Sequence, residues 1–528
     1  MNRRIATLIA LILCTLNPCT AQTSENVSQA AERMAQVMYL INHYYIDTVG
    51  FTKIADAAIT AAMEELDPHS AFICASDVEA TNEPLQGEFE GIGVQFAIIH
   101  DTLTVQEPVA GGPSQRVGIR TGDKIITVDG KNIAGIGLTN TDVFHYLRGP
   151  KGTKVELSIA RREEKEPLYF TVTRDKIPLN SLDAAYQMDN GILMLKLSRF
   201  AAKSNEEILT AVSKCKNPIK GVILDLRDNG GGILPTAIEI SNQFLEKGDL
   251  IVYAEGRKVR EFKEFATGTG TLKNVPLVIL IDENSASASE IVSGAIQDND
   301  RGIIIGRRSF GKGLVQQQMQ LSDGSQLRLT IARYHTPSGR VIQSPYEEGH
   351  KDDYYKNFYM RYLHGENFSA DSIRMPDSLR FKTLKKQRTV YGGGGIMPDI
   401  FIPQDTTGHT AMYSQILRKG LVLDYMNDME DRYRDVWQKK YGKSFELFCQ
   451  KFDSDGIIFD GLISLAKNRD IKTTPEEIET SRKLLTQYMK ALAASAVFGR
   501  EAFYKVIYDD TAEMETAIDV ILKGAVVE

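Results

Sequence analysis

Three continuous apolar runs constrain the fold of this chain more than any other feature. They read "IKGVILDLR", "VPLVILI" and "RGIIIG" at 219–227, 275–281 and 301–306, and segments with helical spacing separate them. Strands that are covered by helices on both faces read as unbroken hydrophobic stretches. Alternation of such strands with helices predicts an α/β fold. Before the first run, Ser204 and Glu207 predict a capping box that opens a helix.

The chain has 528 residues, which is too long for one ordinary hydrophobic core, so we expect several domains. Helical spacing predicts a helical region at 22–84, and short strands with glycine turns predict a small β-rich module at 85–175. The α/β section is expected at 176–405, and a mostly helical region at 406–528. The net charge of −7 argues against nucleic-acid binding, which usually needs a basic surface.

The first residues have the pattern of a secretory signal. Arg3 and Arg4 precede the apolar stretch "IATLIALILCTL", and the small residues Cys19 and Ala21 follow at a cleavage-like position. The stretch is too short to span a bilayer comfortably. We therefore expect a signal peptide at 1–21, an exported mature chain in the periplasm or cell envelope, and no membrane span in that chain. A retained anchor or a lipid on a cysteine is the alternative.

Three cysteines remain after the signal, at Cys74, Cys215 and Cys449. Their wide, irregular spacing matches neither a disulfide framework nor a metal-binding motif. We expect free or buried thiols, with one disulfide as the alternative in an oxidising compartment. We expect no metal and no other cofactor.

The stretch "IDENSASASEI" at 281–291 places serines where an apolar strand gives way to a helix. A serine there lies beside unpaired backbone N–H groups and the positive end of the helix dipole, which can stabilise an oxyanion. The alternative is an N-cap serine followed by small packing residues. A serine nucleophile needs a base, and no histidine lies in a matching loop. Lys312, between two glycines, can serve if burial keeps it neutral; otherwise it is an exposed loop lysine.

Several motifs in order carry a family resemblance. They are "DPHSAF", "GVILDLRDNGGG", "SASASEIVSGAIQD", "GRRSFGKGLVQ", "YHTPSGRVIQ" and "GIMPDI". Together they resemble the carboxyl-terminal processing peptidases, also called tail-specific proteases, over most of the chain before Thr407. The resemblance implies a crotonase-like or ClpP-like α/β protease core with an inserted PDZ domain and helical N- and C-terminal regions.

The resemblance also implies roles for individual residues. Ser287 corresponds to the nucleophile and Lys312 to the general base, and Gln316 corresponds to the glutamine that orients the lysine amine. The oxyanion hole would use the backbone N–H of Ala288 and of a glycine in the run 230–232, namely Gly231 or Gly232. Glu290 and Asp225 are expected to be structural.

The glycine-rich module resembles a PDZ domain. The loop that would bind a chain terminus comprises Gly91, Ile92, Gly93 and Val94, and a predicted helix places Val143 and Leu147 on the side of the groove. An extended peptide can add to the edge of such a sheet. The expected partners are proteins or peptides with accessible C-termini. The alternative is a small β-domain that only packs on the protease.

The expected function is therefore an exported serine endopeptidase that forms an acyl-enzyme and whose activity rises as its lysine base loses its proton. A catalytically silent PDZ scaffold for peptide binding is the main alternative, and an esterase or amidase with the same dyad is a weaker one. The long apolar faces of the terminal helices predict self-association or adaptor docking.

Overall fold

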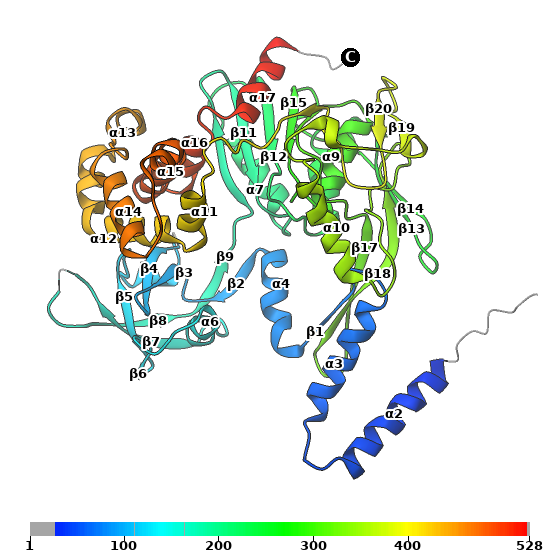
Figure 1. Cartoon of the computed structure of the whole chain (residues 1–528), viewed down its shortest axis with the longest axis horizontal. Coiled ribbons are helices and arrows are strands. Elements are labelled where there is room, and N and C mark those ends of the chain that lie inside the picture. The colour runs from blue at the N-terminus through cyan, green and yellow to red at the C-terminus, as the bar shows by residue number, and fades with distance from the viewer. Residues whose placement is uncertain (1–26, 110, 163, 525–528) are drawn as a thin grey trace, which may run out of the picture. The chain divides into compact units, whose positions relative to one another are not determined.

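The computed structural model describes residues 27–109, 111–162 and 164–524 (Figure 1). The predicted signal peptide at 1–21 lies outside these residues. The chain divides into two compact units, Met1–Glu65 and Leu66–Glu528. Within the described residues, we find no helix with both the length and the apolar character that crossing a bilayer requires.

The first unit contributes two helices, α2 (Val27–Tyr44) and α3 (Phe51–Glu64), which confirms the helical prediction for this stretch. No side chain of either helix is buried. Large apolar side chains such as Met34 and Leu40 are about half exposed. These helices therefore gain little stability from packing within the described chain.

A six-stranded sheet forms the centre of the second unit, in the order β10-β11-β12-β15-β16-β21. Neighbours from β11 to β21 run parallel, and β10 is antiparallel to β11. The bounds are β10 (Leu182–Gln187), β11 (Ile192–Leu197), β12 (Gly221–Asp225), β15 (Leu277–Ile281), β16 (Ile303–Gly306) and β21 (Ile400–Phe401). The three apolar runs thus form the adjacent strands β12, β15 and β16, as the sequence predicted.

Helices cover both faces of this sheet, and this explains the unbroken apolar runs. In β15, Ile279 packs in the cluster with α7 (Ser204–Ser213), α8 (Leu234–Asn242) and α9 (Ala288–Asp298). Its neighbour Leu280 faces the opposite side, with Ile521 of α17 (Ala512–Lys523). Because successive side chains in a strand point to opposite faces, both must be apolar. Each such buried side chain contributes about 1.5–3 kcal/mol.

A second sheet has the order β1-β18-β13-β14, and β17 pairs with β18. The bounds are β1 (Ala71–Ile73), β13 (Leu250–Glu255), β14 (Phe262–Phe265), β17 (Leu314–Gln320) and β18 (Gln326–His335). The β17–β18 hairpin turns at Asp323–Gly324, where Gly324 has φ +90°. Because β1 pairs with β18, the segment just before β1 is placed beside the hairpin. The chain then forms α10 (Lys351–Leu363), β19 (Arg380–Lys382) and β20 (Thr389–Tyr391).

The glycine-rich module forms its own antiparallel sheet, β3-β4-β5-β7-β8, with β6 beside β5. The bounds are β3 (Val94–Ile99), β4 (Thr102–Pro108), α5 (Pro113–Arg116), β5 (Lys124–Val128), β6 (Lys131–Asn132), α6 (Asn140–Leu147), β7 (Lys154–Ala160) and β8 (Leu168–Thr173). Val143 and Leu147 lie on one face of α6, as predicted, and this face is buried in the core of the module. The chain enters after α4 (Val78–Gln86) along β2 (Glu88–Gly91) and leaves along β9 (Asp175–Pro178), and these two strands pair.

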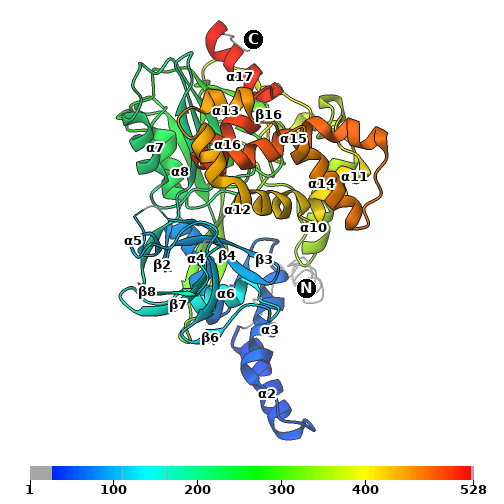
Figure 2. The same ribbon diagram turned by 90° about the vertical axis from the view of Figure 1, so that its left-hand side faces the viewer.

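The C-terminal region is helical, and most of it forms one cluster with its own core (Figure 2). Its helices are α11 (Ala411–Arg418), α12 (Leu421–Tyr441), α13 (Phe445–Lys451), α14 (Ile457–Asn468), α15 (Pro475–Phe498) and α16 (Arg500–Ile507). Helix α15 starts with a capping box between Thr474 and Glu477. The last helix, α17, instead packs on the central sheet.

The predicted capping box at Ser204 and Glu207 is wrong. The N-cap of α7 is Lys203, and it makes no side-chain cap. The Glu207 carboxylate instead accepts hydrogen bonds from the backbone N–H groups of Ser181 and Leu182, at 2.9 and 2.8 Å. Glu207 therefore anchors the start of β10, because tertiary partners compete with local caps for the same side chain.

Candidate active site

Three loops meet at the carboxyl edge of the central sheet, where the ends of neighbouring parallel strands lie together. They are the glycine loop (227–232) after β12, the serine loop (282–287) after β15, and the lysine loop (307–313) after β16. All three line one cleft of about 480 Å³. The cleft residues that the sequence singled out are Gly231, Gly232, Ser287, Ala288, Lys312 and Gln316. The fold therefore brings every predicted catalytic and oxyanion residue to one place.

Ser287 lies at the last position before α9 in an unusual backbone conformation. Its φ is +55° and its ψ is −110°. A residue with a side chain seldom adopts positive φ, and such strain persists only where the surroundings enforce it. The Ser287 N–H donates to Glu290 Oε2 at 2.8 Å, which fixes this backbone.

Glu290 is a fully buried carboxylate that joins the serine and lysine loops. Its Oε2 accepts the N–H groups of Ser287 and Lys312, at 2.8 and 2.9 Å. Its Oε1 accepts the Ser309 hydroxyl at 2.6 Å and the Gly311 N–H at 2.7 Å. Burial raises the pKa of Glu290 to about 7, although these hydrogen bonds oppose the rise. The expectation of a structural role thus extends to aligning Ser287 with Lys312.

Lys312 carries a partly buried amine. Its Nζ donates to Gln316 Oε1 at 2.9 Å, and Gln316 Nε2 donates to the carbonyl of His69 at 2.5 Å. Desolvation, with help from the positive charge of Arg328, lowers the pKa of Lys312 from 10.5 to about 8, while Asp67 oppositely favours the charged form. A substantial neutral fraction near neutral pH follows, which a lysine base requires.

The motif "DPHSAF" forms the turn that presents this carbonyl. Asp67 Oδ1 accepts the N–H groups of His69 and Ser70, at 2.8 and 2.9 Å. The Ser70 hydroxyl donates to Asp67 Oδ2 at 2.5 Å and accepts the Thr330 N–H of β18 at 3.1 Å. Burial and the charge of Lys312 lower the pKa of His69 to about 4. The sequence analysis did not identify His69 as a neighbour of Lys312. The only signal for it was that the motif "DPHSAF" is among those that carry the family resemblance.

Glycine is required in the glycine loop by the space around it. Gly231 has φ +100°, and a Cβ there would lie 2.7 Å from the Ala286 carbonyl and 2.9 Å from the Ser287 Cβ. Gly232 has φ +152°, and a Cβ there would lie 2.1 Å from the Phe200 carbonyl. The Gly231 N–H donates to Asn229 Oδ1 at 2.9 Å, within its own loop.

Tyr334 of β18 also bridges the two loops, and the sequence did not identify it. Its hydroxyl donates to the carbonyl of Lys312 and lies 3.3 Å from the carbonyl of Ser287. The neighbouring His335 stacks on Tyr253, with 4.5 Å between ring centroids, and is not among the residues that line the cleft. This placement indicates a structural role for His335.

A second, smaller pocket of about 240 Å³ lies in the glycine-rich module, between α6 and the loop before β3. All six predicted peptide-binding residues line it: Gly91, Ile92, Gly93, Val94, Val143 and Leu147. Phe96 and Phe144 make it strongly apolar. Gly93 has φ +72°, so the loop turns in a conformation that suits glycine.

Cys215 and Cys449 are free thiols. Among the described residues, no group of three or more His, Cys, Asp or Glu side chains has an arrangement that could hold a metal ion.

Comparison with known proteins identifies the family. A family model described as "Peptidase family S41" matches residues 191–355, and a PDZ domain model matches residues 104–161. The chain is 34% identical over 342 residues to a carboxy-terminal-processing protease of Bartonella bacilliformis, covering 64% of this chain and 78% of that protein. The chain belongs to peptidase family S41.

Two further proteins are similar to this chain. The S41 peptidase is 33% identical over 315 residues to a probable CtpA-like serine protease of Staphylococcus aureus (strain N315), covering 59% of this chain and 62% of that protein. A photosystem II D1 C-terminal processing protease of known structure is 28% identical, covering 59% of this chain and 83% of that chain, with a TM-score of 0.33. The two family models and the Bartonella relative show that the protein is a serine-type, carboxy-terminal-processing peptidase with a PDZ domain. Residues 412–499 match a family of unknown function (DUF8443).

Proposed function

We propose that this S41 peptidase is an exported endopeptidase that cleaves proteins near their C-termini through a Ser287–Lys312 dyad. One observation carries the proposal: Lys312 is partly buried and lines the same cleft as Ser287, and its pKa is lowered to about 8. A lysine that is easily deprotonated beside a serine is the pairing that general-base activation of a hydroxyl requires.

The proposed reaction has two stages. Neutral Lys312 takes the Ser287 proton as the hydroxyl oxygen attacks a peptide carbonyl, and the protonated lysine then donates that proton to the leaving amine. Water next attacks the acyl-enzyme, with Lys312 again as the base. Gln316 accepts a hydrogen bond from the amine and so keeps it directed during both stages.

The oxyanion would be held by backbone N–H groups. Ala288 N lies at the start of α9, where the helix dipole favours negative charge. We propose Gly231 or Gly232 as the second donor. The Gly231 N–H already donates a hydrogen bond to Asn229 Oδ1, and this favours Gly232 as the second oxyanion donor.

The apolar pocket beside α6 is the proposed site for substrate C-termini. The backbone of Gly91–Val94 would bind the terminal carboxylate, and Val143 and Leu147 would contact the last apolar side chain. Gly91 is the last residue of β2, the strand along which the chain enters the module from the protease core. A peptide bound in this pocket could therefore shift β2 and, through it, the position of the module at the cleft. We propose that binding there gates access to Ser287.

Three further predictions belong to this proposal. Export rests on the signal sequence at 1–21, and the periplasm or cell envelope stays a prediction. The domain boundaries 22–84, 85–175, 176–405 and 406–528 also stay predictions. Self-association or adaptor docking is proposed for the N-terminal helices because their apolar side chains are exposed.

The test compares wild type with Ser287→Ala on an unfolded reporter protein that has an apolar C-terminal tail. We expect wild type to cleave the reporter and Ser287→Ala to bind but not cleave it. Equal cleavage by both proteins would remove Ser287 from the mechanism. Binding without cleavage by both would instead support the silent PDZ scaffold, and turnover of small esters alone would support the esterase alternative.

A further inference from the structure

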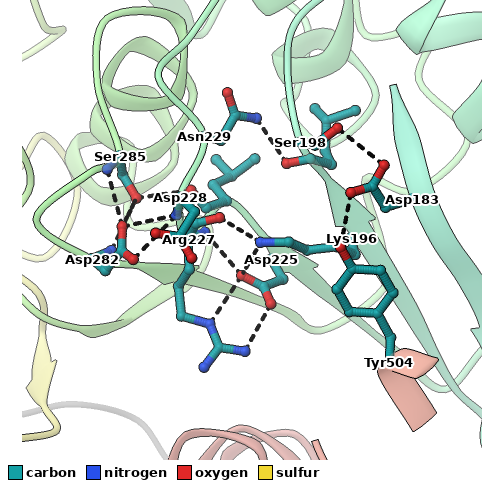
Figure 3. Close-up of polar contacts among 12 residues, drawn as sticks. Asp183, Lys196, Ser198, Asp225, Arg227, Asp228, Asn229, Asp282, Ser285 and Tyr504 are labelled. Carbon is teal, nitrogen blue, oxygen red and sulfur yellow. Dashed lines mark hydrogen bonds and ion pairs between the residues drawn. The ribbon is translucent and has the colours of Figure 1, made fainter. Parts of the chain in front are cut away.

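A third pocket, lined by charged side chains, includes residues of the three loops, and the proposed chemistry does not use it. It measures about 400 Å³ and lies at the carboxyl edge of the central sheet, against α16 and α17. The sheet edge, the loops that follow it and α17 contribute its charged side chains, which are Asp183, Lys196, Arg227, Asp228, Asp282, Arg307 and Glu513. Figure 3 shows how densely the residues of the glycine and serine loops are connected here.

Arg227 is the first side chain of the glycine loop, and it is held firmly. Asp225 at the end of β12 accepts from Arg227 Nε at 3.1 Å and from Nη2 at 2.8 Å (Figure 3). Lys196 Nζ donates to the Arg227 carbonyl and lies 3.4 Å from Asp225. Burial alone would raise the pKa of Asp225, but Arg227 and Lys196 outweigh it and hold that pKa below its usual range.

Glu513 of α17 lies between two arginines. Its Oε1 is 3.5 Å from Arg227 Nη1 and 3.6 Å from Arg307 Nη1. Arg307 belongs to the lysine loop, and its Nε donates to Glu283 of the serine loop at 2.7 Å. The side chains of Arg227, Arg307 and Glu513 are 13%, 10% and 16% exposed, so water screens their charges only partly. One carboxylate of the C-terminal helix thus faces cations that belong to separate catalytic loops.

The glycine and serine loops are also joined directly, so a shift of one moves the other. The Asp228 N–H donates to Asp282 Oδ1 at 3.0 Å, and Asn284 Nδ2 donates to Asp228 Oδ1 at 2.9 Å. The Ser285 hydroxyl donates to the carbonyl of Leu226 at 2.8 Å. Displacement of Arg227 would therefore be transmitted toward Ser287.

The C-terminal helices are themselves anchored, so Glu513 has a defined position. Tyr504 and Arg500 of α16 both donate to Asp183 Oδ2, at 2.8 and 2.9 Å, and Figure 3 shows the tyrosine contact. Tyr508 lies under the Arg227 guanidinium, at 4.8 Å from the ring centroid. Met514, next to Glu513, is buried against the sheet.

We propose that Glu513 is a positioning residue that holds the glycine and lysine loops in their catalytic arrangement through Arg227 and Arg307. This inference rests on the proposed function. Arg227 keeps its pair with Asp225 and Arg307 keeps its pair with Glu283. Without the Glu513 carboxylate, however, the two ion pairs that link these guanidinium groups through one anion in a partly buried pocket are lost. The loops then separate, and the oxyanion donors and Ser287 lose their alignment. The C-terminal helix is in this way part of the catalytic apparatus rather than an appendage.

The experiment uses the full-length chain with Glu513→Gln, which keeps the shape of the side chain and removes its charge. Glu515→Gln is the matched control, because Glu515 is an exposed acid two residues further along α17. The readouts are kcat and KM on the unfolded tailed reporter, the labelling rate of Ser287 by a fluorophosphonate probe, and the melting temperature.

For Glu513→Gln we expect kcat and the labelling rate to fall about tenfold with KM nearly unchanged, since small misalignments of reacting groups are costly. The midpoint of the pH profile should stay that of wild type, because Glu513 does not face Lys312. Glu515→Gln should match wild type. Glu513→Asp keeps the negative charge on a shorter side chain, farther from the two arginines. Its kcat should lie between those of wild type and Glu513→Gln, and it serves as the test if Glu513→Gln does not fold.

A Glu513→Gln enzyme with the kcat of Glu515→Gln would overturn the inference, as would a loss explained entirely by a shifted pH midpoint. Failure of the proposed function reads differently. In that case Ser287→Ala would keep its activity, and the fluorophosphonate would not label Ser287 in wild type.

Discussion

Lys312 Nζ and Gln316 Oε1 lie 2.9 Å apart, and this hydrogen bond holds the amine inside the catalytic cleft. Gln316 is uncharged, so it directs the amine without stabilising its protonated form as a carboxylate would. The lowered pKa of Lys312 is therefore compatible with a firmly held side chain.

The pH dependence follows from the lowered lysine pKa of about 8. Below that pH Lys312 is protonated and cannot accept the Ser287 proton, so kcat/KM should rise about tenfold per pH unit and level off above the midpoint. Initial rates on the tailed reporter between mildly acid and mildly alkaline buffers would measure this. A flat profile across the neutral range would contradict Lys312 as the base.

Two substitutions of Gln316 should separate orientation from charge. Gln316→Ala removes the partner of the amine and of the His69 carbonyl, so kcat should fall by about 10²-fold. Gln316→Glu keeps an acceptor but adds a negative charge, which raises the pKa of Lys312 and moves the pH midpoint upward. Paired pH–rate profiles would show this. An unchanged midpoint in Gln316→Glu would argue that the two side chains do not interact.

Asp67 influences Lys312 by charge and by structure, and two variants divide these effects. Asp67→Asn keeps an acceptor for the His69 and Ser70 N–H groups but removes the charge that raises the lysine pKa. Its pH midpoint should move down while its maximal kcat is largely kept. Asp67→Ala loses the turn, so kcat should fall at every pH. Identical profiles for both variants would reject this division.

The glycine loop offers a steric test. Gly231→Ala places a methyl group 2.7 Å from the Ala286 carbonyl in a backbone conformation with φ +100°, so we expect about 1–3 kcal/mol of lost stability and severe loss of kcat. A methyl group at position 230 would extend into open space, with no contact within 4 Å, so Gly230→Ala should cost far less. Chemical denaturation and reporter cleavage measure both effects. Equal effects at the two positions would contradict a close approach of Gly231 to Ser287.

The N-terminal helices α2 and α3 bury none of their side chains within the described chain. Deletion of residues 26–63 should therefore leave the melting temperature nearly unchanged. If the helices associate with a second copy, the deletion should also reduce the number of chains per particle. Light scattering on both proteins measures this. An unchanged number of chains per particle would reject self-association through these helices.

Local patterns in the sequence were sufficient for much of the fold. The apolar runs predicted β12, β15 and β16, and the helical spacing at Val143 and Leu147 predicted α6 with its buried face. Ser287 and Lys312 could be selected because each follows a strand of a recognisable type and the ordered motifs carry a family resemblance. These signals are local, since strand burial and helix periodicity depend on neighbouring residues.

The tertiary structure decided which distant groups complete the site. His69 reaches the lysine only because β1 pairs with β18, and Glu513 reaches Arg227 only because α17 returns to the sheet after the helical cluster. Tertiary contacts also explain why Glu207 is not the predicted cap: its carboxylate accepts a hydrogen bond from the Ser181 N–H just before β10. The sequence by itself determined the strands, and with the family resemblance it led to the proposal of Ser287 as nucleophile and Lys312 as base. Burial, the lysine pKa and the long-range hydrogen bonds were decided by chain topology, because they depend on contacts between segments far apart in the sequence.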